Sequence, residues 1–232
     1  MLKQRTHTRK QLVMAQFVEE GYQLSEEIGY ENLTVRALTS RLNYNSSMVY
    51  YYFSNFDNLL KLIAIHYLTP FEEELCRIQM RYAFDSTAML LHSLDAFVAS
   101  AVDYPRQFQV LYRGGSSWTL EEALEVYHSI FSDAEVCQTY PVMTTQAGPE
   151  IPLLDMCILQ GRFKIKSRDK LTELIGCISD SLIEKAVLAR NEEKPMLRTR
   201  FCEYMRMFFE HYSAPPDRQT ICIAQKRTAS GL

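Results

Sequence analysis

The side chains best suited to chemistry lie in one segment, residues 29–60, which combines an arginine with hydroxyl and amide groups. Groups of these kinds bond to the edges of DNA bases and to phosphate oxygens. Such contacts need a rigid element that carries the side chains into a groove. The apolar residues of the segment have the spacing of two short helices joined by a turn, which is an element of that kind.

The first short helix is expected to begin after Thr34, a residue type that caps helix N-termini. Its inner side would consist of Val35, Leu38 and Leu42, which follow at helical spacing. The pattern breaks at residues 43–45, Asn-Tyr-Asn. Because Asn tolerates the left-handed backbone that a helix end or a tight turn needs, a turn is expected here.

The second helix is expected from Ser46 to about Phe53, with Asn45 as its cap. Ser54 and Asp57 then have the Ser-x-x-Asp spacing of a capping box, which predicts the start of a further helix. Two short helices joined by a turn of about three residues form a helix-turn-helix, whose second helix enters the major groove of DNA.

This segment resembles the N-terminal DNA-binding domain of the TetR family of bacterial transcriptional regulators. The matching residues are Gly29, Leu33, Thr34, Val35, Arg36, Leu38, Leu42, the run Met48-Val49-Tyr50-Tyr51-Tyr52-Phe53, Asp57, Leu59 and Leu60. Two positions depart from the family pattern. Asn43 stands where a glycine is usual, which is tolerable because Asn also adopts positive φ. Phe56 stands where a lysine that contacts phosphate is common, and this should weaken DNA binding and its salt dependence.

The resemblance implies which side chains touch DNA. Base contacts are implied for Arg36, Ser46, Ser47 and Met48, and phosphate contacts for Tyr50 and Tyr52, with Thr34 and Asn45 close by. Arg36 can bind guanine O6 and N7, and Met48 can touch a thymine methyl group. Tyr51 and Phe53 are expected to pack inside the three-helix unit. Two roles stay open for Arg41, a phosphate contact or a solvated charge.

The whole chain is expected to be all-α, with about nine helices. Its 232 residues are 47% apolar and include only 8 Gly and 8 Pro, which favours long helices over a many-stranded β fold. Beyond the helix-turn-helix, the expected helices are Thr8 to Ile28, Phe56 to Met80, Ser86 to Asp103, a short one ending near Arg113, Thr119 to Cys137, Lys166 to Arg190, and Pro195 to Tyr212. Pro70 predicts a kink or break in the second of these. Residues 139–152 are expected to form a loop.

The elements divide into three expected parts. Residues 1–54 form the helix-turn-helix DNA-binding domain, 55–213 a helical regulatory and dimerisation domain, and 214–232 a polar C-terminal tail. The resemblance implies that the last two helices, residues 166–212, pair with those of a second chain in a homodimer. The final helix is apolar over more of its surface than one partner needs, which supports this. The alternative is that these faces only close the core of one chain.

The charge distribution favours a DNA partner at the N-terminal end only. The net charge is −3, whereas residues 1–61 carry seven basic and six acidic side chains. The first ten residues contain a basic arm, consisting of Lys3, Arg5, Arg9 and Lys10. Such an arm suits phosphate or minor-groove contact, and a solvated terminus is the alternative. The first residues do not resemble a signal peptide and no apolar run is long enough to span a bilayer, so we expect a cytoplasmic protein with no membrane partner.

The six cysteines give no sign of a metal site or a disulfide framework. They are Cys76, Cys137, Cys157, Cys177, Cys202 and Cys222, with no C-x-x-C pair and no His at ligand spacing. Neither a metal nor a cofactor is therefore expected. Buried, reduced thiols are the expectation, and a redox-sensing pair is the alternative.

The regulatory half is rich in side chains that can line an apolar pocket. They are Met80, Phe84, Met89, Phe97, Tyr104, Phe108, Tyr112, Trp118, Tyr127 and Phe131. The effector would then be a small apolar or aromatic molecule, although the same residues can simply form packed core. The polar groups that can orient a ligand are His92, Gln109, Arg113 and His128.

These observations predict a sequence-specific DNA-binding transcriptional regulator, most often a repressor in this family. It would bind a pseudo-palindromic operator as a dimer and leave it when an effector shifts its conformation. An enzyme is not expected, because the sequence lacks a Gly-rich phosphate loop, G-x-S-x-G and H-E-x-x-H. The alternative is a helical dimeric protein-binding adaptor, derived from such a regulator, that has lost DNA binding. Phe56 and the weak positive charge allow this alternative.

Overall fold

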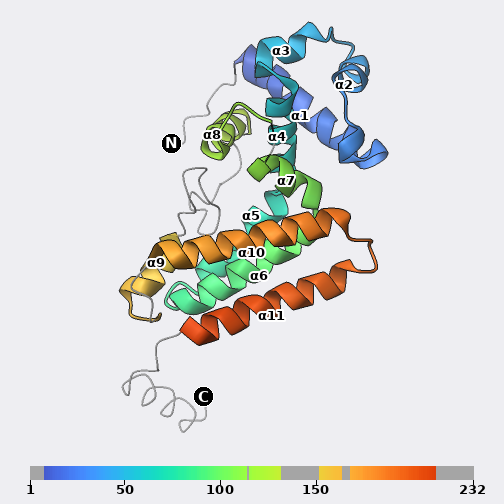
Figure 1. The fold of residues 1–232 in the computed structure, drawn as a ribbon. Helices are drawn as coiled ribbons and strands as arrows, with labels where there is room; N and C mark the ends of the chain where they lie inside the picture. Colours follow the sequence, from blue (N-terminus) through green and yellow to red (C-terminus); the bar gives the residue numbers. More distant parts are fainter. Residues whose placement is uncertain (1–7, 114, 132–151, 164–167, 213–232) are drawn as a thin grey trace.

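The computed structural model of the protein describes residues 8–113, 115–131, 152–163 and 168–212 (Figure 1). Within these ranges it contains eleven α-helices and one short 3-10 turn, so the all-α expectation is confirmed there. The elements are α1 (Arg9–Ile28), η1 (Tyr30–Asn32), α2 (Val35–Arg41), α3 (Ser47–Phe53), α4 (Phe56–Tyr67), α5 (Thr69–Arg81), α6 (Ser86–Asp103), α7 (Pro105–Arg113), α8 (Leu120–Ile130), α9 (Pro152–Leu159), α10 (Arg168–Leu188) and α11 (Lys194–Tyr212).

Two differences account for eleven helices where about nine were expected. The helix expected from Phe56 to Met80 is two helices, because the chain turns at Leu68 (φ −90°, ψ 0°). Pro70 lies in the first turn of α5, where its missing N–H would have had no intrahelical partner in any case. Helix α9 was not expected. Its sequence is apolar on nearly all sides, so it has no amphipathic period that could reveal it.

Other boundaries differ by less. The helix expected from Thr119 to Cys137 is α8, which ends at Ile130. Its start is as expected, because Thr119 and Glu122 form a capping box. The expected loop at 139–152 lies outside the described residues except for its last position, which begins α9. The expected tail at 214–232 lies outside them entirely.

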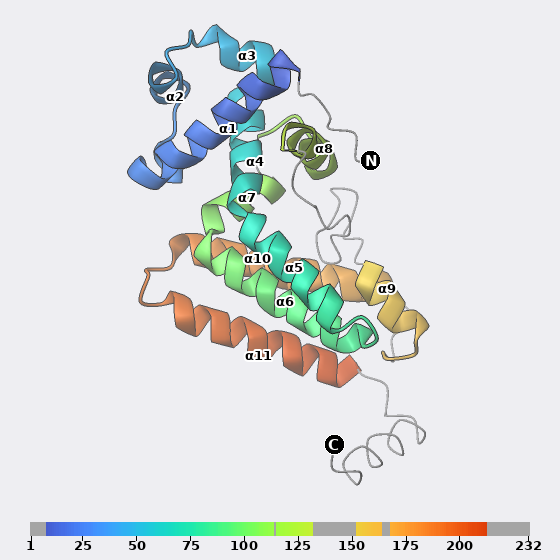
Figure 2. The ribbon, with the colours of Figure 1, turned by 180° about the vertical axis from the view of Figure 1, so that it is seen from behind.

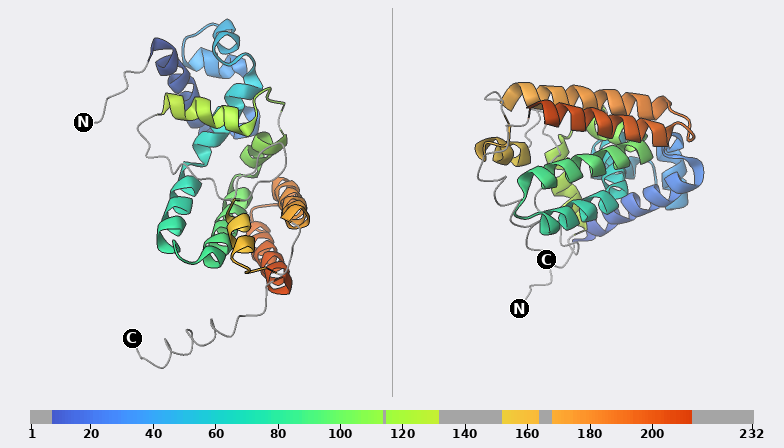
Figure 3. Two further views of the ribbon diagram at one scale, coloured as in Figure 1. Left: turned by 90° about the vertical axis from the view of Figure 1, so that its left-hand side faces the viewer. Right: turned by 90° about the horizontal axis from the view of Figure 1, so that it is seen from below.

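The helices form two tiers that α4 and α5 connect. Helices α1, α2 and α3 lie at one end, and α4 runs from them toward α5 (Figures 1 and 2). At the other end α6 packs against α5, α10 and α11, and the last two lie side by side along the outside (Figure 3). Helix α8 is far from α1 in sequence but packs against both α1 and α4.

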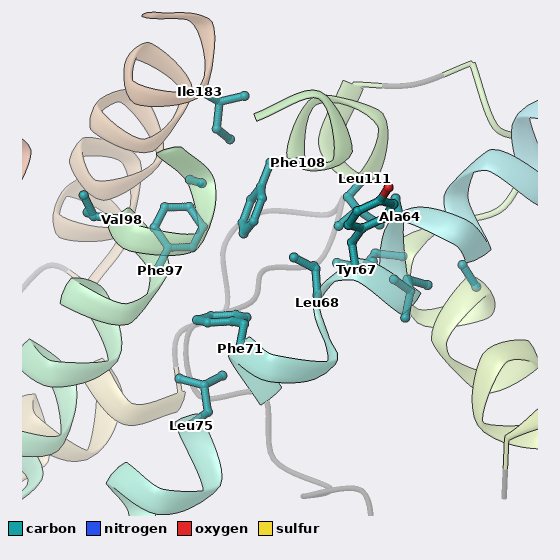
Figure 4. Close-up of a cluster of buried hydrophobic side chains, with 14 of the residues drawn as sticks. Ala64, Tyr67, Leu68, Phe71, Leu75, Phe97, Val98, Phe108, Leu111 and Ile183 are labelled. Atoms are coloured by element: carbon teal, nitrogen blue, oxygen red, sulfur yellow. The ribbon is translucent and has the colours of Figure 1, made fainter. Parts of the chain in front are cut away.

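A buried aromatic cluster connects α5, α6 and α7 below α4. In Figure 4, Phe71, Phe97 and Phe108 converge, with Leu68 and Ile183 beside them. The ring centroids of Phe97 and Phe108 are 5.4 Å apart and those of Phe71 and Phe108 are 6.4 Å apart, both edge to face. Burying one side chain of this size stabilises the fold by roughly 1.5–3 kcal/mol. The cluster therefore fixes the end of α4 to the lower tier.

Helices α1 and α4 pack tightly at Gly21. A Cβ atom here would lie against Ile63 Cδ1 of α4, closer than real Cβ contacts, and 3.7 Å from Leu38 Cδ2 of α2. Ile63 and Leu38 are both fully buried, so neither has free space to move into. The missing side chain lets the N-terminal three-helix unit pack directly on α4.

Replacing Gly21 by Ala should therefore destabilise the protein by about 1 kcal/mol. The expected overpacking, roughly 1–3 kcal/mol, exceeds the helix propensity gained, about 1 kcal/mol. Gly176→Ala is the matched control, since a Cβ at that position in α10 meets no described atom within 4 Å. The control should stabilise the fold by roughly 0.5–1 kcal/mol. Urea unfolding of the two variants tests this, and stabilisation by Gly21→Ala would show that the α1–α4 contact is not tight.

Candidate nucleic-acid interface

Phe17 of α1 forms the centre of the N-terminal three-helix unit. It is fully buried, and its ring stacks on Tyr44 at 5.5 Å and meets Phe53 edge to face at 5.6 Å. Leu38 of α2 and Val49 of α3 are also fully buried in this core. Both short helices are thus held by apolar contacts to α1, because neither is long enough to be stable alone.

The turn between α2 and α3 has the expected form. Asn43 has φ +54°, in the left-handed region, and the Tyr44 N–H donates to Thr39 O at 2.9 Å. At the start of α2, Thr34 is the N-cap, and its Oγ1 accepts from Ala37 N at 3.1 Å. The Thr34 hydroxyl hydrogen is not used in that bond. It therefore stays available to donate to a phosphate oxygen.

Two expected caps lie at other positions. Helix α3 begins at Ser47, with Ser46 at the cap position, and the Asn45 side chain accepts from Ser47 N at 3.1 Å without being the cap itself. The capping box expected from Ser54 is absent. Ser54 has φ +67° and ends α3, while Asn55 caps α4 through Asn58 N at 2.7 Å. A residue in the left-handed region cannot also hold the extended backbone of an N-cap.

The residues expected to touch DNA are mostly exposed. Exposed side chains in this set are Thr34, Arg36, Asn45, Ser46, Ser47 and Tyr50, the last with 55% of its surface accessible. Met48 and Tyr52 are only partly exposed and pack against the core, which leaves less of each for DNA. Within the described residues the Arg36 side chain makes no ion pair or hydrogen bond, so its guanidinium can bind a ligand.

Tyr51 differs from its expected place. It was expected to pack inside the unit, but 76% of its surface is exposed, and its ring meets Tyr52 edge to face at 4.9 Å. The helical period explains this, because Val49 and Phe53 occupy the inner side of α3 while residues 46, 47, 50 and 51 recur on the outer side. Applying that period to α3 would have placed Tyr51 with Tyr50 from the sequence.

Arg41 takes a third role, different from both that were expected. Its guanidinium forms ion pairs with Glu20 at 2.9 Å and Glu27 at 2.7 Å, both on α1. The hydrogen bond from Arg41 lowers the pKa of Glu27, and the two carboxylates raise the pKa of Arg41. Arg41 thus fastens the end of α2 to α1, and its charge is balanced before any DNA arrives.

Lys61 does not contribute to a basic surface either. It is buried in α4, its Nζ donates to Trp118 O at 2.9 Å, and burial lowers its pKa. The nearby Phe56 packs against the core where the family pattern has a phosphate-binding lysine. In the expected basic arm, Arg9 and Lys10 are exposed at the start of α1, whereas Lys3 and Arg5 lie outside the described residues. The number of basic residues in the sequence of residues 1–61 is therefore larger than the number of charges that are free to contact DNA.

Among the described residues, the side chains expected to line an effector pocket are divided between the core and the surface. Met89, Phe97, Phe108 and Tyr127 are buried in the core, whereas Met80 and Phe84 are exposed. A groove of about 400 Å³ lies between α5 and α6, but it contains Glu74, Asp95 and Asp103. This lining is more acidic than an apolar ligand requires.

The four polar groups proposed for ligand orientation also lie apart. His92 lines the α5–α6 groove and stacks on Tyr82 at 4.5 Å, while Gln109 accepts from Arg106 at 3.4 Å. His128 is partly buried in α8, and its Nε2 has no hydrogen-bond partner among the described residues; burial lowers its pKa. The side chain of Arg113 lies outside the described residues.

The described cysteines differ in how far they are buried. Of the described cysteines Cys157 is buried, Cys76 and Cys202 are partly buried, and Cys177 is exposed, so the expectation of buried thiols fails for Cys177. Cys137 and Cys222 lie outside the described residues. In the described ranges no cluster of His, Cys, Asp and Glu could hold a metal ion. No helix in the same ranges is both long and apolar enough to cross a membrane.

The left-handed turn residue gives a stability prediction for this unit. Asn43→Ala should cost about 1 kcal/mol of unfolding free energy, because a Cβ-bearing residue without the Asn amide is strained at φ +54°. Asn43→Gly should stay within about 0.5 kcal/mol of the parent protein, because glycine adopts this conformation freely. Chemical denaturation measures both. Equal stability of the Ala and Gly variants would mean that the turn relaxes to another conformation.

Comparison with known proteins identifies this unit. Residues 15–63 match the model of the bacterial regulatory proteins, tetR family, which covers most of α1 through α4. A solved structure of RolR in complex with the ligand resorcinol has 16% identity and a TM-score of 0.46, covering 84% of this chain and 88% of that chain. A HlyIIR mutant with residues 170-185 substituted by alanine has 18% identity and a TM-score of 0.42, covering 86% and 97% respectively. No curated protein matches the sequence. The N-terminal helices of this chain, residues 15–63, therefore match the tetR family of bacterial regulatory proteins.

Proposed function

We propose that this regulator is a repressor that binds a pseudo-palindromic DNA operator as a homodimer and leaves it when a small effector binds. The match of residues 15–63 to the tetR family model supports a DNA-binding transcriptional regulator. The operator symmetry, the repression and the effector belong to the proposal. In it, residues 1–54 form the DNA-binding domain and residues 55–213 the regulatory and dimerisation domain.

The outer side of α3 is the observation that carries the DNA-binding proposal. Ser46, Ser47, Tyr50 and Tyr51 recur at intervals of three and four residues and are all exposed. They supply hydroxyl groups, which donate to phosphate or bond to base edges. Arg36, exposed on α2, adds an unpaired guanidinium that can contact guanine. We propose that DNA is contacted by Thr34, Arg36, Asn45, Ser46, Ser47 and Tyr50. Tyr51 is added to this set, and Met48 and Tyr52 contribute less.

Helices α10 and α11 support a homodimer. The outer face of α11 consists of Met196, Arg200, Tyr204, Met207 and His211, which lie within one side at helical spacing. On α10 the exposed Leu174 and Leu188 flank Cys177 on one side. The exposed methionine, tyrosine and leucine side chains of these two adjacent helices would be stabilised by burial against a second copy. The dimer would place two copies of α3 to read two half-sites.

The proposal of an effector rests on the match of residues 15–63 to the tetR family model and not on a cavity among the described residues. Release requires that the effector bind the DNA-free conformation more tightly than the DNA-bound one. To reduce the DNA-bound conformation from 99% to 1% of the molecules, the effector must bind the DNA-free conformation more tightly by about 5.5 kcal/mol. We propose a small apolar or aromatic effector, because aromatic side chains are abundant in the helical half.

A dimeric protein-binding adaptor without DNA binding is the second candidate. Two basic side chains of residues 1–61 are not free to contact DNA. Arg41 pairs with two carboxylates, and Lys61 is buried. Phe56 is packed rather than charged. These observations reduce the non-specific attraction for DNA, but they leave Arg36 and the outer side of α3 free. The direct test of DNA binding separates the two candidates.

The first prediction for this function compares two arginines on one helix. Purified protein should select one palindromic site from genomic fragments. Arg36→Ala should weaken binding to that site roughly 10- to 100-fold, because a bidentate base contact contributes about 1–3 kcal/mol. Arg41→Ala removes the same charge from α2 but should change the affinity by less than about threefold, because Arg41 is already paired. Titrations at several salt concentrations measure both.

Each outcome of this comparison has a distinct meaning. Equal losses for the two variants would show that Arg36 contributes only charge, and would contradict base reading. The absence of any selected site at low salt, from folded dimeric protein, would favour the adaptor. A shallow salt dependence is expected for the parent protein, because few phosphate contacts carry an unpaired basic group.

The second prediction concerns the dimer. Met207→Glu places a carboxylate on the exposed face of α11, where 66% of the Met207 surface is accessible in one chain. The variant should dissociate the dimer at least tenfold more readily, roughly 1.4 kcal/mol, because a buried unpaired charge is unfavourable. Met80→Glu on α5, also largely exposed, is the control and should leave the dimer intact. Sedimentation equilibrium measures the association. A monomeric parent protein, or equal effects of the two variants, would contradict an α10–α11 interface.

A further inference from the structure

The turn before α8 is joined to the start of α4 through one buried side chain, Asn58. The Asn58 Oδ1 accepts from the Ser117 backbone N–H at 3.0 Å and from Ser116 Oγ at 2.8 Å. The Asn58 Nδ2 donates to Ser117 Oγ at 3.1 Å. Asn58 has no accessible surface, so these bonds are shielded from water.

The same amide also contacts the recognition helix α3. Asn58 Nδ2 donates to the backbone oxygen of Phe53, the last residue of α3, at 2.7 Å. A backbone N–H can only donate and a backbone oxygen can only accept. The contacts to Ser117 N and Phe53 O therefore fix which end of the amide points each way. Asn58 is thus a bridge between α3 and the turn at 115–118.

Additional contacts hold this turn against α4. Lys61 Nζ donates to Trp118 O at 2.9 Å, and Asn55 Nδ2 donates to Ser117 Oγ at 3.3 Å. Gly115 lies so close to Asp57 that a Cβ would be 3.0 Å from Asp57 Oδ2. The turn is therefore closely packed on the first turn of α4, directly below the end of α3.

Helix α8, which follows the turn, is attached at its other end as well. Tyr127 OH and His66 Nδ1 of α4 lie 2.9 Å apart, and Gln11 Nε2 of α1 donates to Ser129 O at 2.9 Å. Figure 3 shows α8 lying across α1 and α4. A displacement of α8 along α4 would therefore pull on the turn at 115–118 and on the Asn58 amide.

We propose that Asn58 is a positioning residue for DNA recognition, which holds the end of α3 in its reading position only while the turn at 115–118 engages the amide. The proposal rests on the proposed function, in which α3 reads DNA. Without the two serine hydroxyls the amide keeps only the Ser117 N–H on its oxygen and the Phe53 oxygen on its nitrogen, so it is held less firmly against the end of α3. Helix α3 then samples other orientations relative to α1 and α2. Movement of α8 in the regulatory domain reaches the DNA contacts by this path.

The test uses the double variant Ser116→Ala/Ser117→Ala in the full chain. Both residues lie in a turn and neither is fully buried, so the variant should fold, with an unfolding midpoint lowered only by the loss of the hydroxyl bonds to Asn58. Ser129→Ala is the control, because its hydroxyl donates within α8 to Val126 O and does not touch the bridge. The affinities for the selected operator and for unrelated DNA are measured at one salt concentration. Asn58→Ala is a second variant that removes the bridge completely.

The double variant should bind the operator roughly three- to thirtyfold more weakly, which is the range typical of mutations that alter the coupling between two sites. Its affinity for unrelated DNA should be unchanged, because no charged group is lost. The control should stay within about twofold of the parent protein. An equal loss on both DNAs, or no loss at all, would overturn the proposal.

Hydrogen exchange of the free protein gives a readout that does not depend on DNA. The Ser54 N–H donates to Tyr50 O at 3.0 Å at the end of α3, and it should exchange faster in the double variant but not in Ser129→Ala. Unchanged exchange at Ser54 would contradict the bridge even if DNA binding falls. If the parent protein selects no operator while Ser54 exchange responds as expected, the proposed function fails and the mechanical link stands.

Discussion

Helix α4 is buried along most of its length, and this constraint determines how the rest of the protein is arranged. It packs against α1, α3, α5, α7 and α8, and only Leu60 among residues 58–65 is partly exposed. A buried amide or ammonium group without a partner is costly, so the polar residues of α4 must find partners on neighbouring elements. Asn58 and Lys61 find them in α3 and in the turn before α8.

The same requirement reduces the charge available for DNA. Lys61 is used inside the fold, and Arg41 is used to fasten α2 to α1. In the described part of the chain, the free groups near the helix-turn-helix are Arg36, the exposed Arg9 and Lys10 at the start of α1, and the hydroxyl groups on the outer side of α3. An interface of this composition favours directed hydrogen bonds over general attraction to phosphate. In the proposed function this composition would give specific recognition with a weak dependence on salt.

Helix α4 packs against helices of both tiers, so a movement in the lower tier can reach α3 through it. Its far end is fixed by the aromatic cluster of α5, α6 and α7, and its near end carries the bridge to α3. Packed cores of this density move between discrete arrangements and do not deform gradually. An effector that favours one arrangement of the lower tier would therefore favour one orientation of α3, provided that it binds the two arrangements with different affinities.

The sequence by itself determined the helical architecture and the helix-turn-helix, because caps, left-handed turn residues and apolar spacing are local signals. Thr8, Gly29, Thr34 and Asn43 have the places that these signals predict. Local signals failed where several rules competed, as at Ser54 and Asn55, and where a helix has no polar side, as in α9.

Only the tertiary structure decided what the polar side chains do. Asn58 and Lys61 have partners 59 and 57 residues away along the chain, and Arg41 pairs with carboxylates on another helix. No local pattern encodes such a pairing, since it depends on which helices burial brings together. The sequence thus indicated which surface to propose for DNA binding, and the packing around α4 decided which charges near that surface are free.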